Sequence, residues 1–240
     1  MEKSKKIKLF IAIFYVTIVG LFLYYLFSKF SIQQLTSYEF IKDNIEYFSK
    51  IKETNYLLLS LAFLLFTVLW VFPFLGFGSP IALLGGFILG KWTGVFIVVL
   101  GLSIGATLLY IFGNYFLKEL VREKFLNKFQ SLEHKFKKSE FLYLLVYRAA
   151  GGIPWQLSCI LPTLFNVKVK NFFLATFIGI IPQIFLVVSI GSGLETVINQ
   201  NLEPPGIIDI LSSPNIYLPL VVFLILVVAT IILRKFFYKQ

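Results

Sequence analysis

The stretch YLLLSLAFLLFTVLWVFPFLGFGSPIALLGGFILG, residues 56–90, decides the fold, because it carries no charge and is broken inside by prolines and glycines, among them Pro73, Gly78 and Pro80. One helical membrane crossing needs about 20 apolar residues, and two crossings with a turn need more than about 40. These 35 residues therefore predict a helix that enters the membrane, breaks and returns. Broken backbone at membrane depth is tolerated only where protein or a water-filled cavity covers it. The segment thus predicts a pathway through the membrane.

The overall composition is that of an integral membrane protein. Of the 240 residues, 58% are hydrophobic and 14% are charged, and the mean hydropathy is +0.85. Four further uncharged runs are each long enough to cross a bilayer: residues 9–27, 92–117, 171–194 and 210–233. Lysines precede the first run, but no small-residue cleavage site follows it, so we expect a retained signal anchor. Soluble classes of protein are excluded.

The sequence contains no recognisable motif for catalysis or metal binding. Cys159 and His134 are the only cysteine and histidine, and neither has neighbours at metal-ligand spacing. Residues 101–105, GLSIG, match the string of a nucleophile elbow, but Ser103 lies in an apolar run with no acid–histidine pair to activate it. We therefore expect a protein that is not an enzyme and that holds no metal or cofactor.

The basic residues orient the chain, because cytoplasmic loops retain lysine and arginine. If the four uncharged runs cross and the segments 56–90 and 141–167 re-enter, most of the 22 lysines and arginines face the cytoplasm. A full crossing by residues 56–75 would instead place the basic stretch 114–140 outside. The predicted fold is an all-α integral membrane protein with four transmembrane helices and two opposed re-entrant helical hairpins. Both termini are expected in the cytoplasm and the protein in the cell membrane.

An internal repeat supports this architecture. A shift of 78 residues aligns four identical pairs: Phe87 with Phe165, Gly101 with Gly179, Leu108 with Leu186, and Gly113 with Gly191. Each half has a broken hydrophobic segment followed by an apolar run, and the crossing between the halves makes the repeat inverted. Paired broken segments in two halves point to a substrate site at the membrane midplane. The alternative is that proline and glycine only kink ordinary spans, since both are common in membrane helices.

Arg148 is the only charged residue within residues 141–167. A helix entering from the cytoplasm at about 1.5 Å per residue carries it about 10 Å deep, where an arginine usually faces a cavity, backbone carbonyls or a ligand. Snorkelling to the surface is the alternative, because the side chain is long. The break that follows frees backbone groups beside a fixed cation, which favours an anionic headgroup as ligand. The candidate substrate-binding residues are Arg148, Gly151, Gly152, Pro154, Pro73, Gly78 and Pro80.

These residues resemble the VTT domain of the DedA-like, SNARE-associated Golgi protein superfamily. The second half of the motif is carried by Arg148, Pro154, FNVKVKNFFLATFIGIIP at 165–182 and the stretch from Gly191 to Gly193. The first half is carried by GSPIALLGGFILG at 78–90, continuing to Gly105 and Tyr110. The resemblance implies a polytopic protein with two opposed re-entrant loops and a role in lipid translocation or membrane lipid homeostasis.

The resemblance also divides the chain and marks where it departs from the family. The match covers about residues 56–195, so the chain divides into a signal anchor with an outer loop at 1–55, a VTT-like core at 56–195, and an acidic outer loop with a last transmembrane helix at 196–240. Many DedA proteins carry acidic residues near the first re-entrant segment, thought to serve proton coupling, whereas residues 56–90 contain none. The resemblance therefore does not carry proton-driven transport over to this chain.

Residues 114–140 form a basic amphipathic segment between the halves. Phenylalanine and leucine recur near the helical period, and seven basic residues occupy much of the remainder: Lys118, Arg122, Lys124, Lys128, Lys135, Lys137 and Lys138. We expect a helix on the cytoplasmic leaflet, where each basic residue contributes about 1 kcal/mol with anionic lipids. A solvated linker helix packed on the protein is the alternative. Nucleic-acid binding is not expected, because membrane topology accounts for the net charge of +10.

The function expected from these features is the movement or equilibration of a phospholipid or lipid-linked phosphate between leaflets. Arg148 would hold the headgroup, and the prolines and glycines of both broken segments would shape the path. Two alternatives stay open, namely a transporter of small ions or solutes and a membrane scaffold without transport activity.

Overall fold

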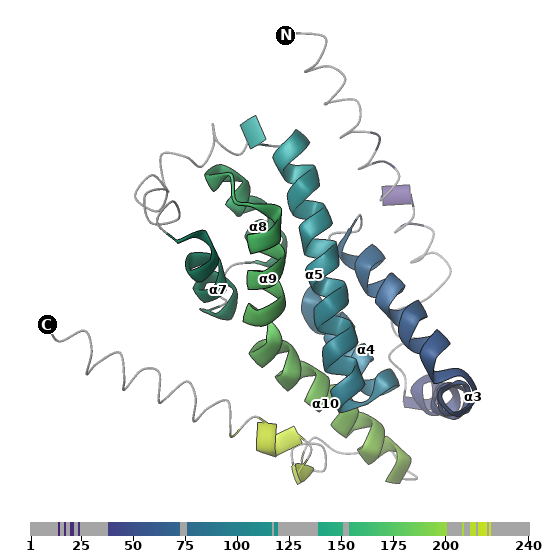
Figure 1. The fold of residues 1–240 in the computed structure, drawn as a ribbon. Helices are drawn as coiled ribbons and strands as arrows, with labels where there is room; N and C mark the ends of the chain where they lie inside the picture. The colour runs from purple at the N-terminus through teal and green to yellow at the C-terminus, as the bar shows by residue number, and fades with distance from the viewer. Residues whose placement is uncertain are drawn as a thin grey trace, which may run out of the picture.

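The computed structural model describes residues 38–72, 76–116, 118–119, 139–150 and 154–200, together with isolated positions nearer the two ends. The elements in chain order are α3 (Tyr38–Val71), α4 (Gly78–Leu89), α5 (Lys91–Phe116), α7 (Glu140–Ala150), α8 (Trp155–Ile160), the 3-10 helix η1 (Leu161–Phe165), α9 (Val169–Gly179) and α10 (Ile181–Gln200) (Figure 1). The described residues include no strand, so for them the predicted all-helical class is confirmed.

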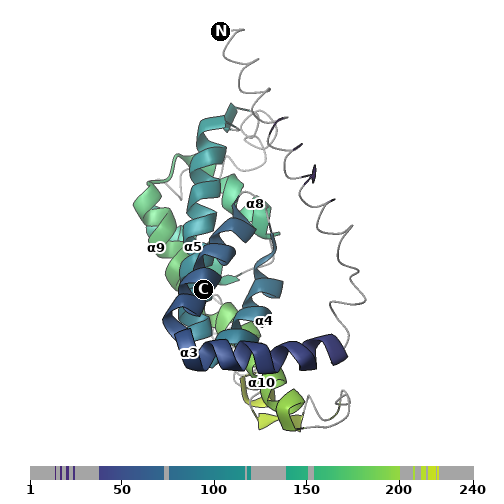
Figure 2. The ribbon, with the colours of Figure 1, turned by 90° about the vertical axis from the view of Figure 1, so that its right-hand side faces the viewer.

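The uncharged stretch 56–90 contains the predicted break. α3 ends at Val71 and α4 begins at Gly78. α3 is itself kinked at Asn55 (φ −145°, ψ 56°), and Figure 2 shows its two arms running in different directions. The stretch Lys50–Val71, which contains the kink and the whole second arm, has 22 residues and is long and apolar enough to cross a membrane. It exceeds the short re-entrant helix that the sequence predicted because it begins before the uncharged run.

α5 confirms the apolar run predicted at 92–117. It has 26 residues and is the second helix long and apolar enough to cross a membrane. A single residue, Gly90, separates it from α4 and adopts a positive φ of 75°. Glycine suits this turn because a side chain there would strain the backbone. The Gly90 N–H donates to the Gly86 carbonyl at 3.0 Å, so the short helix α4 turns directly into α5.

The apolar run 171–194, which the sequence predicts to be one span, is bent in the structure. α9 and α10 divide it and meet at a bend of 45° beside Ile180. Pro182 accounts for the bend, because in a continuous helix its ring removes a backbone N–H and clashes with the carbonyl four residues earlier. α10 then continues to Gln200, beyond the predicted end.

The other two predicted spans, 9–27 and 210–233, lie outside the described residues apart from isolated positions. Much of the predicted terminal parts 1–55 and 196–240 lies outside them as well. Within the described part, two helices can cross a membrane by length and composition, or three if α9 and α10 together form one bent span.

The element boundaries repeat with the 78-residue offset found in the sequence. The offset carries the start of α5 at Lys91 onto the start of α9 at Val169. It carries the end of α3 at Val71 onto Ala149, one residue before the end of α7. It also carries α4 onto α8 and η1 taken together. Each half therefore consists of an arm, a break, a short helical segment and a longer helical stretch.

The short segment of each half packs against the long stretch of the other half. A Cβ on Gly191 of α10 would overlap the carbonyl oxygen of Leu83 in α4. At the equivalent position of α5, a Cβ on Gly113 would lie 3.5 Å from Cγ2 of Thr163 in η1. The identical glycines of the sequence repeat thus sit at equivalent contacts between the halves.

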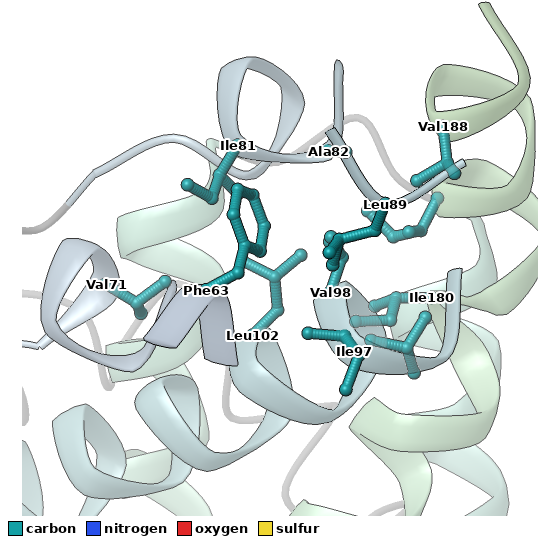
Figure 3. Packing of buried hydrophobic residues seen from close by; sticks show 12 residues of the cluster. Phe63, Val71, Ile81, Ala82, Leu89, Ile97, Val98, Leu102, Ile180 and Val188 are labelled. Carbon is teal, nitrogen blue, oxygen red and sulfur yellow. The ribbon is translucent and has the colours of Figure 1, made fainter. Parts of the chain in front are cut away.

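Buried apolar side chains fill the space between α3, α4, α5 and α10. Figure 3 shows Phe63 of α3 close to Ile81 of α4, with Val98 and Leu102 of α5 and Val188 of α10 in the same cluster. The outer face of α3 is apolar too, and its exposed residues include Leu57, Leu61 and Leu65. A helix that is hydrophobic all round fits a membrane span.

Candidate anion site around Arg148

Arg148 lies in the last turn of α7, beside α9 (Figure 1). Only 4% of the residue is exposed, so its guanidinium does not reach the surface as a snorkelling arginine would. All three guanidinium nitrogens donate to uncharged acceptors. Nε donates to Thr176 Oγ1 at 3.1 Å, Nη1 to Ser158 Oγ at 2.6 Å, and Nη2 to Cys159 Sγ at 3.7 Å. The acceptors belong to α8 and α9.

Three aromatic rings surround the same guanidinium. Its Cζ lies 5.0 Å from the ring centroid of Phe172, 5.1 Å from that of Trp155 and 5.9 Å from that of Tyr147. Each distance is within the range of a cation–π interaction, about 6 Å. The rings attract the cation but carry no net charge, so they do not neutralise it.

No carboxylate is among the partners of Arg148 in the described ranges. Removing an ion from water costs several kcal/mol, and buried charges are normally paired. An arginine also has five N–H donors, and the three bonds leave two of them without an acceptor among the described residues. Within the described part of the chain, the site therefore has positive charge without a counter-charge and donors without acceptors, which together complement an oxyanion.

Two of the surrounding rings carry buried polar atoms that lack a hydrogen-bond partner in the described part of the chain. These atoms are the hydroxyl oxygen of Tyr147 and Nε1 of Trp155. Most buried side-chain polar groups are hydrogen-bonded, so an unpaired one calls for an explanation. The remaining unpaired buried atoms of the described residues belong to Asn114, Thr163 and Ser189.

Close helix contacts hold Arg148 in position. A Cβ on Gly179 of α9 would lie only 2.7 Å from Cβ of Arg148, so glycine permits the close approach of α9 to α7. Gln183 of α10 donates from Nε2 to the carbonyls of Arg148 and Ala149, at 3.2 and 3.0 Å. The last carbonyls of a helix have no partner within that helix. Gln183 therefore caps the broken end of α7 beside the guanidinium.

Two contacts of Tyr110 support the aromatic rings around Arg148, and a third contact lies at the start of α9. Tyr110 of α5 stacks on Phe172 at a centroid distance of 4.5 Å and an interplanar angle of 14°. Its hydroxyl donates to the carbonyl of Val167 at 2.6 Å. At the start of α9, Glu140 Oε2 accepts a hydrogen bond from the backbone N–H of Lys168 at 3.2 Å. The first half of the chain, through Tyr110, thus supports one ring of the site in the second half.

The predicted site residues are only partly brought together. Pro154 lies directly before α8, close in sequence to the partners of Arg148, and is exposed. Gly78 and Pro80 lie in the first turn of α4, and no described contact joins either of them to Arg148. Three residues lie outside the described ranges: Pro73, Gly151 and Gly152.

Lys118 is the one basic residue of segment 114–140 that the structure describes. Its Nζ donates to Oδ1 of Asn166, in the turn after η1, so the start of the segment is tied to the core. The other predicted lipid contacts lie outside the described residues: Arg122, Lys124, Lys128, Lys135, Lys137 and Lys138.

Sequence reasoning identified Arg148 but missed the side chains around it. They are Tyr147, Trp155, Ser158, Phe172 and Thr176. One signal was available, because Phe172 and Thr176 are four residues apart and share a helix face. Nothing in the sequence, however, joins that face to α8.

Residues 72–193 match the family model of the VTT domain. The chain is similar to the uncharacterized protein YqeD of Bacillus subtilis, with 31% identity over 127 residues, covering 52% of this chain and 61% of that protein. It is also similar to the Transmembrane protein 41 homologs of Dictyostelium discoideum (28% over 192 residues, 78% of this chain and 55% of that protein) and Caenorhabditis elegans (29% over 156 residues, 61% of each). The chain spans less than two thirds of the length of each relative. No solved structure matches it.

Proposed function

Because this chain belongs to the VTT-domain family of membrane proteins, we propose that it moves or equilibrates a phospholipid or lipid-linked phosphate between the two leaflets. In this proposal, Arg148 binds the anionic headgroup. The observation that carries it is the buried guanidinium, whose described partners are all neutral. A phosphate supplies the missing negative charge and can accept two parallel hydrogen bonds from the planar guanidinium.

The proposed architecture has four crossings and two opposed re-entrant hairpins, with both termini in the cytoplasm and the protein in the cell membrane. The repeated element boundaries support it, as do the breaks that precede α4 and α8. The distribution of lysine and arginine supports the orientation. In this arrangement the broken backbone of the two halves lines a path near the midplane, where transporter sites are commonly found.

The proposed path is shaped by the residues at the two breaks: Pro73, Gly78, Pro80, Gly151, Gly152 and Pro154. The basic residues of segment 114–140 bind anionic headgroups at the cytoplasmic leaflet. Moving a lipid requires no bond to be made or broken, so the proposal includes neither catalysis nor a cofactor.

Lipid movement by Arg148 variants tests the proposal. Purified protein is reconstituted into liposomes with a fluorescent phospholipid, and an impermeant quencher reports how fast inner-leaflet label becomes accessible. Arg148→Lys keeps the charge but loses the planar fork, so movement should slow, and Arg148→Ala should abolish it. Losing one charge-assisted contact costs about 1.5–3 kcal/mol, equivalent to about a ten- to hundredfold lower rate if the contact forms mainly in the translocation intermediate.

Lys170→Ala is the matched control, because Lys170 is an exposed basic residue of α9 in the same half. All variants must be as monodisperse in detergent as the wild type. Wild-type lipid movement by well-folded Arg148→Ala would overturn the headgroup site. Ion flux without lipid movement would favour the transporter of ions or solutes, and a wild type inactive in both assays would favour the scaffold.

A further inference from the structure

Each half has a tryptophan close to its break, and the two indole rings differ in hydrogen bonding. The 78-residue offset places Trp70 at the position of Arg148, and Phe77 at the position of Trp155. In the first half, Nε1 of Trp70 donates to the carbonyl of Phe77 at 2.9 Å. In the second half, Nε1 of Trp155 is buried and has no partner among the described residues. The indole beside the charged residue is the one left unsatisfied.

We infer that Trp155 Nε1 and the Tyr147 hydroxyl are further ligands of the headgroup, donating hydrogen bonds to the phosphate oxygens that Arg148 neutralises. This inference rests on the proposed function and adds two binding residues to it. The centroids of both rings already lie within 6 Å of Cζ, at 5.1 Å for Trp155 and 5.9 Å for Tyr147. The two unpaired atoms therefore belong to rings that already contact the guanidinium.

The chemistry of the unpaired groups selects an oxyanion. Guanidinium and indole N–H groups only donate hydrogen bonds, and the phenol hydroxyl adds another donor. A phosphodiester offers two non-bridging oxygens and one negative charge, matching both these donors and the single uncompensated cation. A metal ion would be repelled by the guanidinium and would find few coordinating atoms. A water molecule could satisfy some donors but would leave the charge unpaired.

The surroundings favour a phosphate attached to acyl chains over free phosphate. Leu142 and Val146, one turn apart on the outer face of α7, are 57% and 64% exposed, and Leu157 of α8 is 44% exposed. The helices that carry Arg148 and two of its partners thus also present apolar surface to the surroundings, which suits a ligand with a polar and an apolar part. The preferred ligand is therefore an anionic phospholipid headgroup with its tails along α7 and α8.

Binding of a water-soluble phospholipid tests the two added ligands. The full chain in detergent is titrated by calorimetry with dihexanoyl phosphatidylglycerol. Trp155→Phe and Tyr147→Phe each keep the ring and remove one donor, so each should raise the dissociation constant about tenfold. Trp92→Phe is the matched control, since Trp92 is 76% exposed and packs on Phe185 away from Arg148. Its affinity should equal that of the wild type.

The outcomes separate this inference from the proposal on which it rests. Wild-type affinity in both Phe variants, with binding lost in Arg148→Ala, would overturn the added ligands and leave the Arg148 site standing. A wild-type protein that does not bind the phospholipid would overturn both. Inorganic phosphate is titrated in parallel, and binding of phosphate as tight as that of the lipid would overturn the choice of a lipid headgroup. Neutral dihexanoylglycerol should not bind.

A measurement on the wild-type protein covers the case in which a variant fails to fold. Protein labelled with [15N]tryptophan has three indole N–H resonances, which Trp70→Phe and Trp92→Phe assign by elimination. Adding dihexanoyl phosphatidylglycerol should shift the Trp155 resonance downfield, because its N–H gains an anionic acceptor, and should leave that of Trp92 in place. A Trp155 resonance that does not move at saturation would overturn the inference.

Discussion

Arg148 and Trp70 occupy equivalent places in the repeat but differ in charge. In the first half, a Cβ on Gly76 would overlap the indole of Trp70, so this ring packs against Gly76, two residues before α4. In the second half, a guanidinium takes the ring's place and lies over Trp155. The same position of the repeat thus holds a neutral indole in the first half and a charged guanidinium in the second. This difference is why the proposed headgroup site belongs to the second half alone.

Gly179→Ala should disturb the site although Gly179 offers no side chain to a ligand. The added methyl would lie 2.7 Å from Cβ of Arg148 and 3.2 Å from the carbonyl oxygen of Leu145, so α7 and α9 would have to separate. We expect a loss of about 1–3 kcal/mol of stability, measured by thermal melting in detergent, together with slower lipid movement. Gly78→Ala is the control for the melting temperature, because its nearest atom would be Cδ1 of Leu102 at 3.5 Å, an ordinary contact. Equal melting temperatures for the two variants would contradict this argument.

Arg148 was predictable because a lone charge in an apolar segment is costly and therefore conspicuous. Its surroundings were not predictable. Ser158, Phe172 and Thr176 reach it from two other helices, and the contact of α7 with α9 depends on a glycine whose role is visible only once both helices are placed. Trp155 gave no signal of its own, since a tryptophan in an apolar run is ordinary in membrane proteins.

At the level of elements, the sequence predicted where helices are interrupted better than how the helices are bent. Proline and glycine predicted the interruptions before α4 and α8, where the structure has them. The bend beside Ile180 was not predicted, although Pro182 is a sequence signal for it. Hydropathy and charge define the length of an apolar run but do not show whether its helix is straight. The sequence places residues 38–55 in an outer segment whose mixed charges fit a solvated helix face, and the structure describes residues 38–54 as the first arm of α3.

Gly191→Ala and Gly113→Ala should differ in effect although the repeat makes their positions equivalent. A methyl on Gly191 would overlap the carbonyl oxygen of Leu83, a backbone atom that can move only with α4 as a whole. A methyl on Gly113 would meet only side-chain atoms, the nearest at 3.5 Å. We expect Gly191→Ala to lose about 1–3 kcal/mol or more and Gly113→Ala to melt like the wild type. Thermal melting of the two purified variants side by side decides the point, and a Gly191→Ala protein as stable as Gly113→Ala would refute the backbone contact.

For the whole molecule, the packing of α4 on α10 and of η1 on α5 makes the two halves one interlocked unit. A displacement of either short segment must be accommodated by the other half. Four identical pairs in the sequence revealed the 78-residue offset. They did not reveal that the short segment of each half packs on the other half, because identities align two stretches of sequence without showing which of them are in contact. The same offset also constrains the membrane topology, since equivalent elements of an inverted repeat are expected to enter the membrane from opposite sides.

The location of segment 114–140 distinguishes two membrane topologies, one in which α3 crosses the membrane and one in which it belongs to a re-entrant hairpin. If the stretch Lys50–Val71, which contains the second arm of α3, makes a full crossing, as its length allows, segment 114–140 lies outside the cell. If the arm belongs to a re-entrant hairpin, the segment lies in the cytoplasm, as its basic residues favour. Single cysteines at Ser131, Gln240 and Ser212 test this in a Cys159→Ser background. That background keeps a side-chain acceptor for Nη2 of Arg148.

We expect an impermeant thiol reagent applied to intact cells to label Ser212→Cys and to spare both Ser131→Cys and Gln240→Cys. Thr54→Cys is the positive control, because both topologies place this exposed residue outside. After the membrane is permeabilised, Ser131→Cys and Gln240→Cys should become reactive, which shows that they were shielded by location and not by burial. Labelling of Ser131→Cys in intact cells would overturn the inverted repeat, because the two halves would then enter the membrane from the same side, and α3 would have to be a transmembrane helix in its own right.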